Sequence, residues 1–216
     1  MISHHPDIEI LMDYGTGSLS EGLALVVATH VAMCPDCFAQ LRFIEACGAV
    51  LLDGVAASSM SDTALKDVLQ RLDTPPDPEL TPEILGADAG ADIYLPAPLR
   101  RYLTGSLADL GWRPVGSLFE EHRLSLADKM AITALCKIPA ATQIPTHDHP
   151  GPEYSIVLAG SYQDGDRNYR RGDFSAMDAD CQHWPVVSAD EPCLCLVTLT
   201  ADNGKMVESL DSILGV

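Results

Sequence analysis

The sequence predicts an α+β protein built as two domains, a small all-α domain followed by an all-β barrel. Apolar residues at helical spacing run through 7–72. The stretch 74–92 holds four prolines, many acidic residues and no Lys or Arg, which is typical of a linker. From about residue 94, short β-rich segments alternate with turn residues. In chain order, the expected parts are 1–73, the linker 74–93 and 94–216.

The first two helices are expected before residue 32. Apolar spacing predicts the first over 7–14, and Gly15 follows it as a stop signal. The hydroxyl of Ser18 or Ser20 can accept from a free N–H at the start of the second helix, which makes either one a suitable cap.

The third and fourth helices complete the expected N-terminal domain. The third is expected over 35–52, with Gly54 as its end. The fourth begins at Ser61 or Asp62 and has one apolar face at i, i+3, i+4 and i+7 spacing. That face consists of Leu65, Val68, Leu69 and Leu72.

Strands are expected throughout the C-terminal part. Asp164-Gly165 is a strong signal for a β-hairpin turn between two of them. Several short strands in so few residues favour a closed barrel or a two-sheet jelly roll. The clearest strands are expected at 130–138, 153–162, 168–174 and 193–200.

Composition narrows the class of protein. A net charge of −18 argues against a large nucleic-acid-binding surface, which needs clustered Lys and Arg, but it suits contact with a basic protein surface. The apolar run at 23–33 is too short to span a bilayer, and the N-terminus lacks the pattern of a signal peptide. We therefore expect a cytoplasmic protein without membrane contact, in which closely spaced cysteines bind metal or do redox chemistry.

The first candidate metal site is the pattern His30-x-x-x-Cys34-x-x-Cys37. A structural zinc ion takes four nitrogen or sulfur ligands in a tetrahedron, so one ligand is missing from this set. His5 is the preferred fourth ligand, with His4 as the alternative. Such an ion would stabilise a domain too small for a large core.

Two other interpretations of Cys34 and Cys37 stay open. A redox CxxC pair normally follows a strand in a βαβ unit, and no strand is expected here. Unrelated core cysteines are the other alternative, and His30 at this spacing speaks against it. Zinc is therefore the favoured interpretation.

The second candidate metal site begins with His147-x-His149, followed by Glu153. Alternate residues of a strand share a face, and the Pro-Gly-Pro turn at 150–152 lets Glu153 return to the same place. His183 is the only histidine further along the chain and is the expected fourth ligand. Zinc, iron, manganese or nickel all suit this set.

This second pattern resembles the first motif of the cupin barrels: His-x-His, then Glu, then six residues and Gly160. His183 matches the histidine of the second cupin motif, and 170–174 resembles the turn and strand before it. The sequence departs from that motif because it lacks the Pro-x-Gly before His183 and the Asn after it. The resemblance implies a cupin jelly-roll barrel.

The N-terminal part resembles a zinc anti-sigma domain, whose ligands correspond here to His5, His30, Cys34 and Cys37. Together with a C-terminal cupin, this resembles the ChrR family of anti-sigma factors over nearly the whole chain. The resemblance implies a regulator in which the helical domain sequesters an extracytoplasmic-function sigma factor. The cupin would release that factor in response to oxidative stress, such as singlet oxygen or organic hydroperoxide.

Candidate residues for partner contact and redox chemistry follow. Cys193 and Cys195 share one face of a strand, where they are either oxidisable thiols near the barrel metal or ordinary buried cysteines. Each partner-contact candidate has the alternative that it faces its own core. Those candidates are Leu11, Leu65, Val68 and Leu69.

Two competing functions remain at this point. One is a metal-dependent cupin enzyme, a dioxygenase or an isomerase, with an accessory zinc domain. No acid or base near His147 or His183 requires it, and we expect no catalytic residue. The other is a binding protein in which both metals are purely structural.

Overall fold

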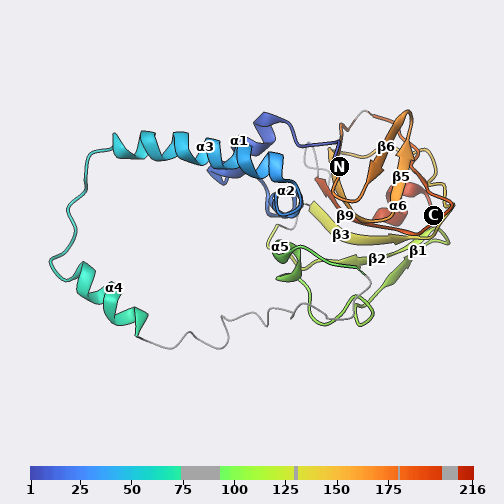
Figure 1. Cartoon of the computed structure of the whole chain (residues 1–216). Helices are drawn as coiled ribbons and strands as arrows, with labels where there is room; N and C mark the ends of the chain where they lie inside the picture. Colours follow the sequence, from blue (N-terminus) through green and yellow to red (C-terminus); the bar gives the residue numbers. More distant parts are fainter. Residues whose placement is uncertain (74–92, 129–130, 180, 201–208) are drawn as a thin grey trace.

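The structure, a computed structural model, describes residues 1–73, 93–128, 131–179, 181–200 and 209–216. Helices form the N-terminal part and two β-sheets form the C-terminal part, as predicted (Figure 1). The predicted linker falls almost entirely in 74–92, outside the described residues. Within the described ranges no single helix is long and apolar enough to cross a membrane, although the helices Glu21–Val31 and Pro35–Asp53 pass that test as a pair bent by 117°.

The helices begin and end near the predicted capping residues. Asp7 caps the first helix by accepting from the Ile10 N–H at 2.8 Å, and Gly17 ends it in the left-handed conformation. Ser20 stands at the start of the second helix, but its side chain makes no capping bond. The helices are α1 (Ile8–Thr16), α2 (Glu21–Val31), α3 (Pro35–Asp53) and α4 (Ala64–Leu72).

Helix α2 is buried between α1 and α3 on one side and the β-sheet on the other. Its first turn approaches the sheet so closely that a Cβ on Gly22 would lie 2.3 and 2.4 Å from the hydroxyls of Thr133 and Thr198. Only glycine allows this approach. Beside it, Glu21 accepts from the Ala127 N–H at 2.6 Å, so the helical part is fixed to the barrel at this point.

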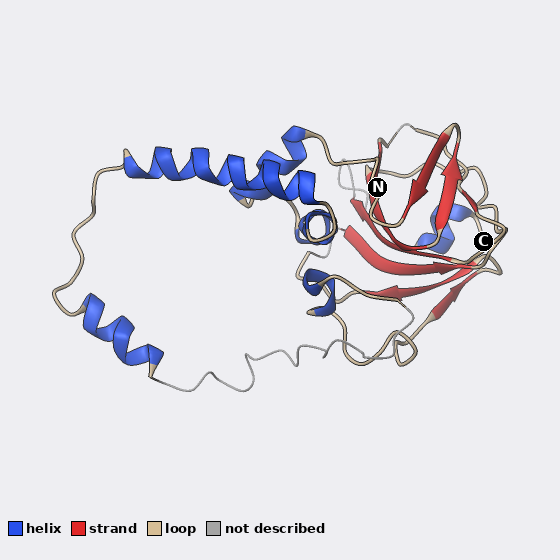
Figure 2. Ribbon diagram, viewed as in Figure 1, coloured by secondary structure: helices blue, strands red, loops and turns tan. Residues whose placement is uncertain are grey.

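Two antiparallel sheets form the barrel (Figure 2). The six-stranded sheet has the order β1-β2-β3-β9-β4-β7, and the three-stranded sheet has the order β6-β5-β8. This arrangement confirms the predicted two-sheet barrel. The strands are β1 (Arg113–Val115), β2 (Phe119–Arg123), β3 (Ala131–Ile138), β4 (Glu153–Ala159), β5 (Ser161–Asp164), β6 (Arg167–Arg170), β7 (Phe174–Met177), β8 (Val186–Val187) and β9 (Cys193–Thr200).

Two predicted strands are in fact two strands each. The segment 153–162 breaks at Gly160, whose φ of 72° lets the chain leave one sheet and enter the other. The segment 168–174 breaks in the same way near Gly172, which has a φ of 91°. The hairpin prediction is confirmed, since Asp164 pairs with Arg167 across a two-residue turn.

The sequence did not predict β1, β2, β8 or two short helices, α5 (Ala97–Arg100) and α6 (Leu210–Leu214). Strand β2 has a polar sequence because it buries a charge: Glu121 is fully buried and forms ion pairs with Arg113 and Arg123. Helix α6 packs its apolar side chains against the barrel.

Candidate metal centres

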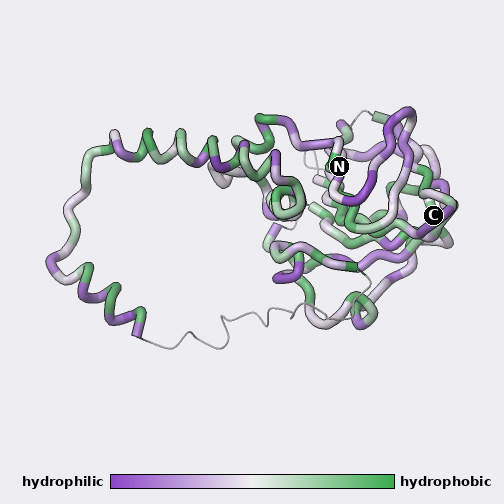
Figure 3. Tube along the Cα trace, in the orientation of Figure 1, coloured by the Kyte–Doolittle hydropathy of each residue, from purple (hydrophilic) through white to green (hydrophobic). Residues whose placement is uncertain are grey.

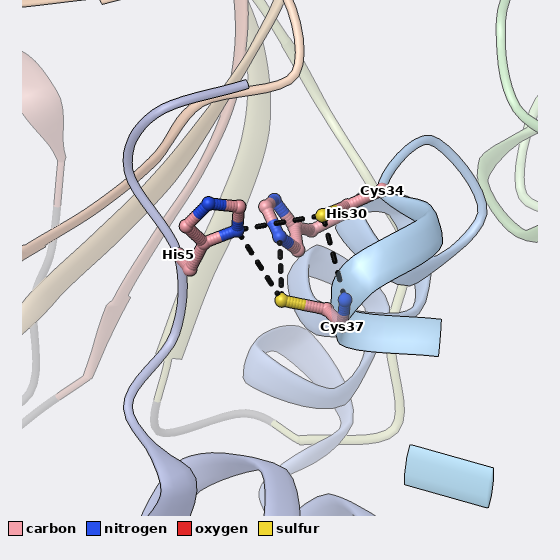
Figure 4. Close-up of side chains that lie close together, drawn as sticks. All are labelled: His5, His30, Cys34 and Cys37. Atoms are coloured by element: carbon pink, nitrogen blue, oxygen red, sulfur yellow. Dashed lines mark hydrogen bonds between the residues drawn. The ribbon is translucent and has the colours of Figure 1, made fainter. Parts of the chain in front are cut away.

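Four side chains from three separate segments converge beside the barrel (Figure 4). Their ligand atoms all lie within 4.8 Å of one another. We call this set the helical cluster: His5, His30, Cys34 and Cys37. The Nδ1 of His5 lies 3.4 Å from each of the two sulfurs, and the Nε2 of His30 lies 3.2 Å from the Cys37 Sγ.

Local structure explains how the helical cluster forms. His30 stands in the last turn of α2, and the chain then bends into α3, with Pro35 in its first turn. Cys34 occupies the capping position of α3, where its sulfur accepts from the Cys37 N–H at 3.5 Å. This turn brings both thiols to the same side, and the segment before α1 brings His5 over them.

The distances in the helical cluster suit a tetrahedral ion. Zinc bonds of about 2.3 Å to sulfur and about 2.0 Å to nitrogen place neighbouring ligand atoms about 3.5 Å apart. The observed separations of 3.2 to 3.4 Å are close to that value. Residues of this type at this spacing could therefore hold a zinc-like ion.

Burial makes the helical cluster a poor place for unpaired charge. It lowers the pKa of His30 to about 4 and, with help from Cys34, raises the pKa of Cys37 to about 12. Without a cation the imidazole and the Cys37 thiol are therefore both neutral at pH 7. A cation favours the thiolate, so metal binding would release protons and weaken in acid.

The two histidines near the N-terminus have different places. His5 lies in the helical cluster, whereas His4 faces Asp173 of the barrel, with 3.5 Å between its Nδ1 and a carboxylate oxygen. The His4 ring also lies 4.5 Å from the ring of Tyr169. The structure thus places His5, the preferred fourth ligand candidate, beside His30 and the two cysteines, and places His4 elsewhere.

A second group of side chains converges at the barrel, and we call it the barrel cluster: His147, His149, Glu153 and His183. The Nε2 of His183 lies 2.9 Å from that of His147 and 3.2 Å from that of His149. A carboxylate oxygen of Glu153 lies 4.0 Å from the His149 Nε2.

The opposite nitrogen of each of these imidazoles already has a partner. The Nδ1 of His147 lies 2.8 Å from the Pro145 carbonyl, and that of His149 lies 3.2 Å from the Gly151 carbonyl. An Nδ1–H that donates to a carbonyl leaves a lone pair on Nε2. Nitrogen lone pairs this close repel one another, and a shared cation removes that repulsion. The donor set therefore fits a divalent metal.

Asp164 supports the barrel cluster and was missed as a functional candidate. This buried carboxylate lies 2.8 Å from the Nδ1 of His183 and also accepts from the Trp184 N–H at 3.3 Å. Burial opposes ionisation of Asp164, but the hydrogen bonds from His183 and Trp184 and the nearby imidazoles together outweigh burial and lower the pKa of the carboxyl. The sequence showed Asp164 only as a turn residue, because its pairing with His183 depends on the path of the later strands.

Asp164→Asn should weaken metal binding at the barrel cluster by about 10- to 100-fold, the usual effect of removing a carboxylate that orients a histidine ligand. Competition with a chelator measures this affinity. Asp166→Asn is a matched control, because Asp166 is exposed in the same hairpin. Equal affinities in the two variants would show that Asp164 does not support a metal ligand.

The barrel cluster opens into a mostly apolar cavity of about 80 Å³. His147, Glu153 and His183 lie in its wall, and the remaining wall is largely aliphatic and aromatic. Three side chains of α6 close part of the wall: Leu210, Ile213 and Leu214. Such a cavity suits a small apolar molecule with one polar group that can reach the cluster.

The two redox candidates lie close together in the barrel interior. The sulfurs of Cys193 and Cys195 are 3.4 Å apart, and both residues are buried. Cys195 also lines the cavity, in the same wall as the barrel cluster. The hydrogen bond with Cys193 and burial raise the pKa of the Cys195 thiol well above its usual value.

The partner-contact candidates divide into one buried residue and three exposed ones. Leu11 is fully buried in the core, so it belongs to its own domain and the suggestion of partner contact is wrong for this residue. Leu65, Val68 and Leu69 are 71, 53 and 52% exposed on α4, which buries none of its residues. Figure 3 shows hydrophobic and hydrophilic residues alternating along this helix.

Comparisons with known proteins agree with both parts of the fold. Residues 101–202 match the family described as the ChrR cupin-like domain. The anti-sigma-E factor ChrR of Cereibacter sphaeroides is 32% identical over 203 residues, which cover 93% of this chain and 91% of that protein.

A solved structure is similar over nearly the same length. It is the crystal structure of Rhodobacter sphaeroides SigE in complex with the anti-sigma ChrR. The matched chain has a TM-score of 0.78 and 32% identity, with 92% of this chain and 99% of that chain covered. Both relatives are regulators, so the alternative of a cupin enzyme has no support from them.

Proposed function

Because the chain belongs to the ChrR family of anti-sigma factors, we propose that it sequesters an extracytoplasmic-function sigma factor and releases it under oxidative stress. Its partner is then a cytoplasmic protein, and this chain acts in the cytoplasm. The boundaries 1–73, 74–93 and 94–216 belong to the same proposal. The first range is the anti-sigma part, the second the linker and the third the sensor.

The observation that carries this proposal is the apolar surface of α3 and α4. The four apolar residues of α4 are each at least half exposed, and α3 also exposes Phe38, Phe43 and Val50. The four α4 residues share one face at i, i+3, i+4 and i+7 spacing, and an exposed apolar patch of this kind usually marks a protein interface. The net charge of −18 favours a partner with a basic surface, such as one that otherwise contacts DNA.

Metal ions support each half of the proposed function. Zinc at the helical cluster would hold α2 and α3 at a fixed angle and so shape the surface that meets the sigma factor. Zinc, iron, manganese or nickel at the barrel cluster would make the barrel responsive to the signal. All eight ligand candidates named from the sequence belong to these two clusters.

The apolar cavity supports an organic hydroperoxide as one signal, because it would admit an apolar body with a polar head near the barrel cluster. Singlet oxygen is the other. Cys193 and Cys195, whose sulfurs are 3.4 Å apart, would be the groups oxidised: one ROOH would accept two electrons from the two thiols, which gives a disulfide, ROH and water.

Leu69→Asp should weaken sigma-factor binding by about 100-fold or more, because it puts a charge in the centre of an apolar contact. The thermal unfolding of the free chain should not change, since this side chain is already exposed. Isothermal titration with extracytoplasmic-function sigma factors from the same genome measures both the stoichiometry, expected as one to one, and the affinity.

Gln70→Asp is the matched control, because it adds the same charge on the opposite side of α4. Binding of Leu69→Asp at the wild-type affinity would remove α4 from the interface. If the wild-type chain binds no sigma factor from its own genome, the anti-sigma proposal itself is wrong.

A further inference from the structure

The helical cluster is not supported by the helices alone, because a turn of the barrel contacts one of its members and also the segment that carries another. Gly172 and Asp173 form the β6–β7 turn. The Nδ1 of His30 lies 2.8 Å from the Gly172 carbonyl, which leaves the Nε2 of His30 facing Cys37. A carbonyl that accepts from the far nitrogen of a histidine fixes both the tautomer and the orientation of the ring.

The same turn holds the segment that carries His5. One carboxylate oxygen of Asp173 accepts from the Ser3 N–H at 2.6 Å and from the His4 N–H at 3.0 Å. The next residue, Phe174, donates its N–H to the His4 carbonyl at 3.0 Å. The backbone on the N-terminal side of His5 is therefore bound to the barrel on both its donor and acceptor sides.

Burial and hydrogen bonding hold the Asp173 carboxylate in a fixed position. It is 1% exposed, and its second oxygen accepts from the Arg170 N–H at 2.9 Å, which fixes the carboxylate within its own turn. Ile2 lies over the turn so closely that a Cβ on Gly172 would be 2.6 Å from its Cδ1. A buried carboxylate with several N–H donors is costly to disturb, so this contact is a specific one.

We propose that the β6–β7 turn is part of the helical metal centre, and that Asp173 acts as a positioning residue which lets the barrel set the metal affinity of that centre. The inference rests on the proposed metal binding at the helical cluster. Gly172 orients His30, and Asp173 confines the segment that carries His5. Neither touches the ion.

The position of the turn in the sheet gives this contact a regulatory meaning. Strand β4 begins with Glu153 of the barrel cluster. Near its other end, Val157 accepts from the Gly172 N–H at 2.8 Å and donates to the Asp173 carbonyl at 3.2 Å. Strand β4 thus carries one member of the barrel cluster and also holds the turn that supports the helical cluster. By linkage, any change in the barrel that moves the turn alters metal affinity at the helices, and metal at the helices biases the barrel in return.

The test is a titration of the full-length, reduced chain with cobalt(II), whose thiolate complexes have a characteristic charge-transfer absorption. Asp173→Ala should weaken cobalt affinity at the helical cluster by about 10- to 100-fold, as loss of a group that supports a ligand usually does. Asp173→Asn keeps one acceptor oxygen, so its cobalt affinity should lie between those of the wild type and Asp173→Ala. Asp166→Ala, which removes an exposed carboxylate of the same barrel, should match the wild type.

Wild-type affinity in Asp173→Ala would overturn the inference and leave the proposed metal binding intact. Absence of the thiolate band from the wild-type chain would instead overturn both. If Asp173→Ala does not fold, Ile2→Ala disturbs the same contact from the helical side. It should also weaken cobalt binding, and an unchanged affinity there would overturn the inference equally.

Discussion

Cys37→Ala should remove one metal ion per chain and reduce sigma-factor binding sharply. The substitution deletes one of two thiolates from a four-ligand set, and structural zinc sites of this kind contribute about 10–16 kcal/mol of binding free energy in small peptides. The angle between α2 and α3 then depends on a thin core alone. Elemental analysis and thermal unfolding with and without a chelator measure the loss.

Two variants make this result specific. Cys47→Ala removes an exposed cysteine from the same helix and should keep both ions. His147→Ala should lose the barrel ion and retain the one bound by the helices. If Cys37→Ala still holds two ions, the helical cluster is not a metal site.

Gly22→Ala should destabilise the chain by about 1–3 kcal/mol, although alanine is the better helix former. The added Cβ would lie 2.3 and 2.4 Å from the hydroxyls of Thr133 and Thr198. Those hydroxyls cannot easily withdraw, since they are buried and lie 2.9 Å apart in a hydrogen bond between neighbouring strands. Helix α2 must therefore shift away from the barrel, and it carries His30 with it.

Gly48→Ala is the matched control, because a Cβ at that position of α3 has no atom within 4 Å. Helix propensity alone predicts that both substitutions stabilise, by up to about 1 kcal/mol. Denaturant unfolding should give opposite signs for the two. A neutral or stabilising effect of Gly22→Ala would mean that helix and sheet are not in close contact there.

The sequence predicted those parts of the fold that depend on neighbouring residues. The proline at 35 and the glycine at 54 bound α3, and the β-rich run at 193–200 gives β9. The sequence did not predict the features that depend on contacts between segments far apart in the chain. Gly160 looks like one residue within a continuous strand, but it is the point at which the chain changes sheets. Strand β2 looks too polar for a buried strand, because its buried Glu121 is neutralised partly by Arg113, which comes from the neighbouring strand β1.

The candidate sites follow the same division. Ligand types and spacing singled out all eight residues that the fold brings into the two clusters. Their supporting groups were out of reach, since Asp164 meets His183 and Gly172 meets His30 only after the sheets have formed. Leu11 was placed among the partner contacts for a similar reason: an apolar residue on an amphipathic helix does not reveal which neighbour covers it.

The isolation of α4 has a kinetic consequence. A nine-residue helix that buries nothing lacks the tertiary contacts from which short helices draw their stability, so it unwinds and re-forms rapidly in the free chain. When such a segment binds a partner, part of the binding free energy is spent on ordering the helix. At a given contact area the complex is therefore weaker and dissociates faster. Rapid dissociation suits a regulator that has to release its partner promptly, and a helix that is stably folded only in the complex provides it.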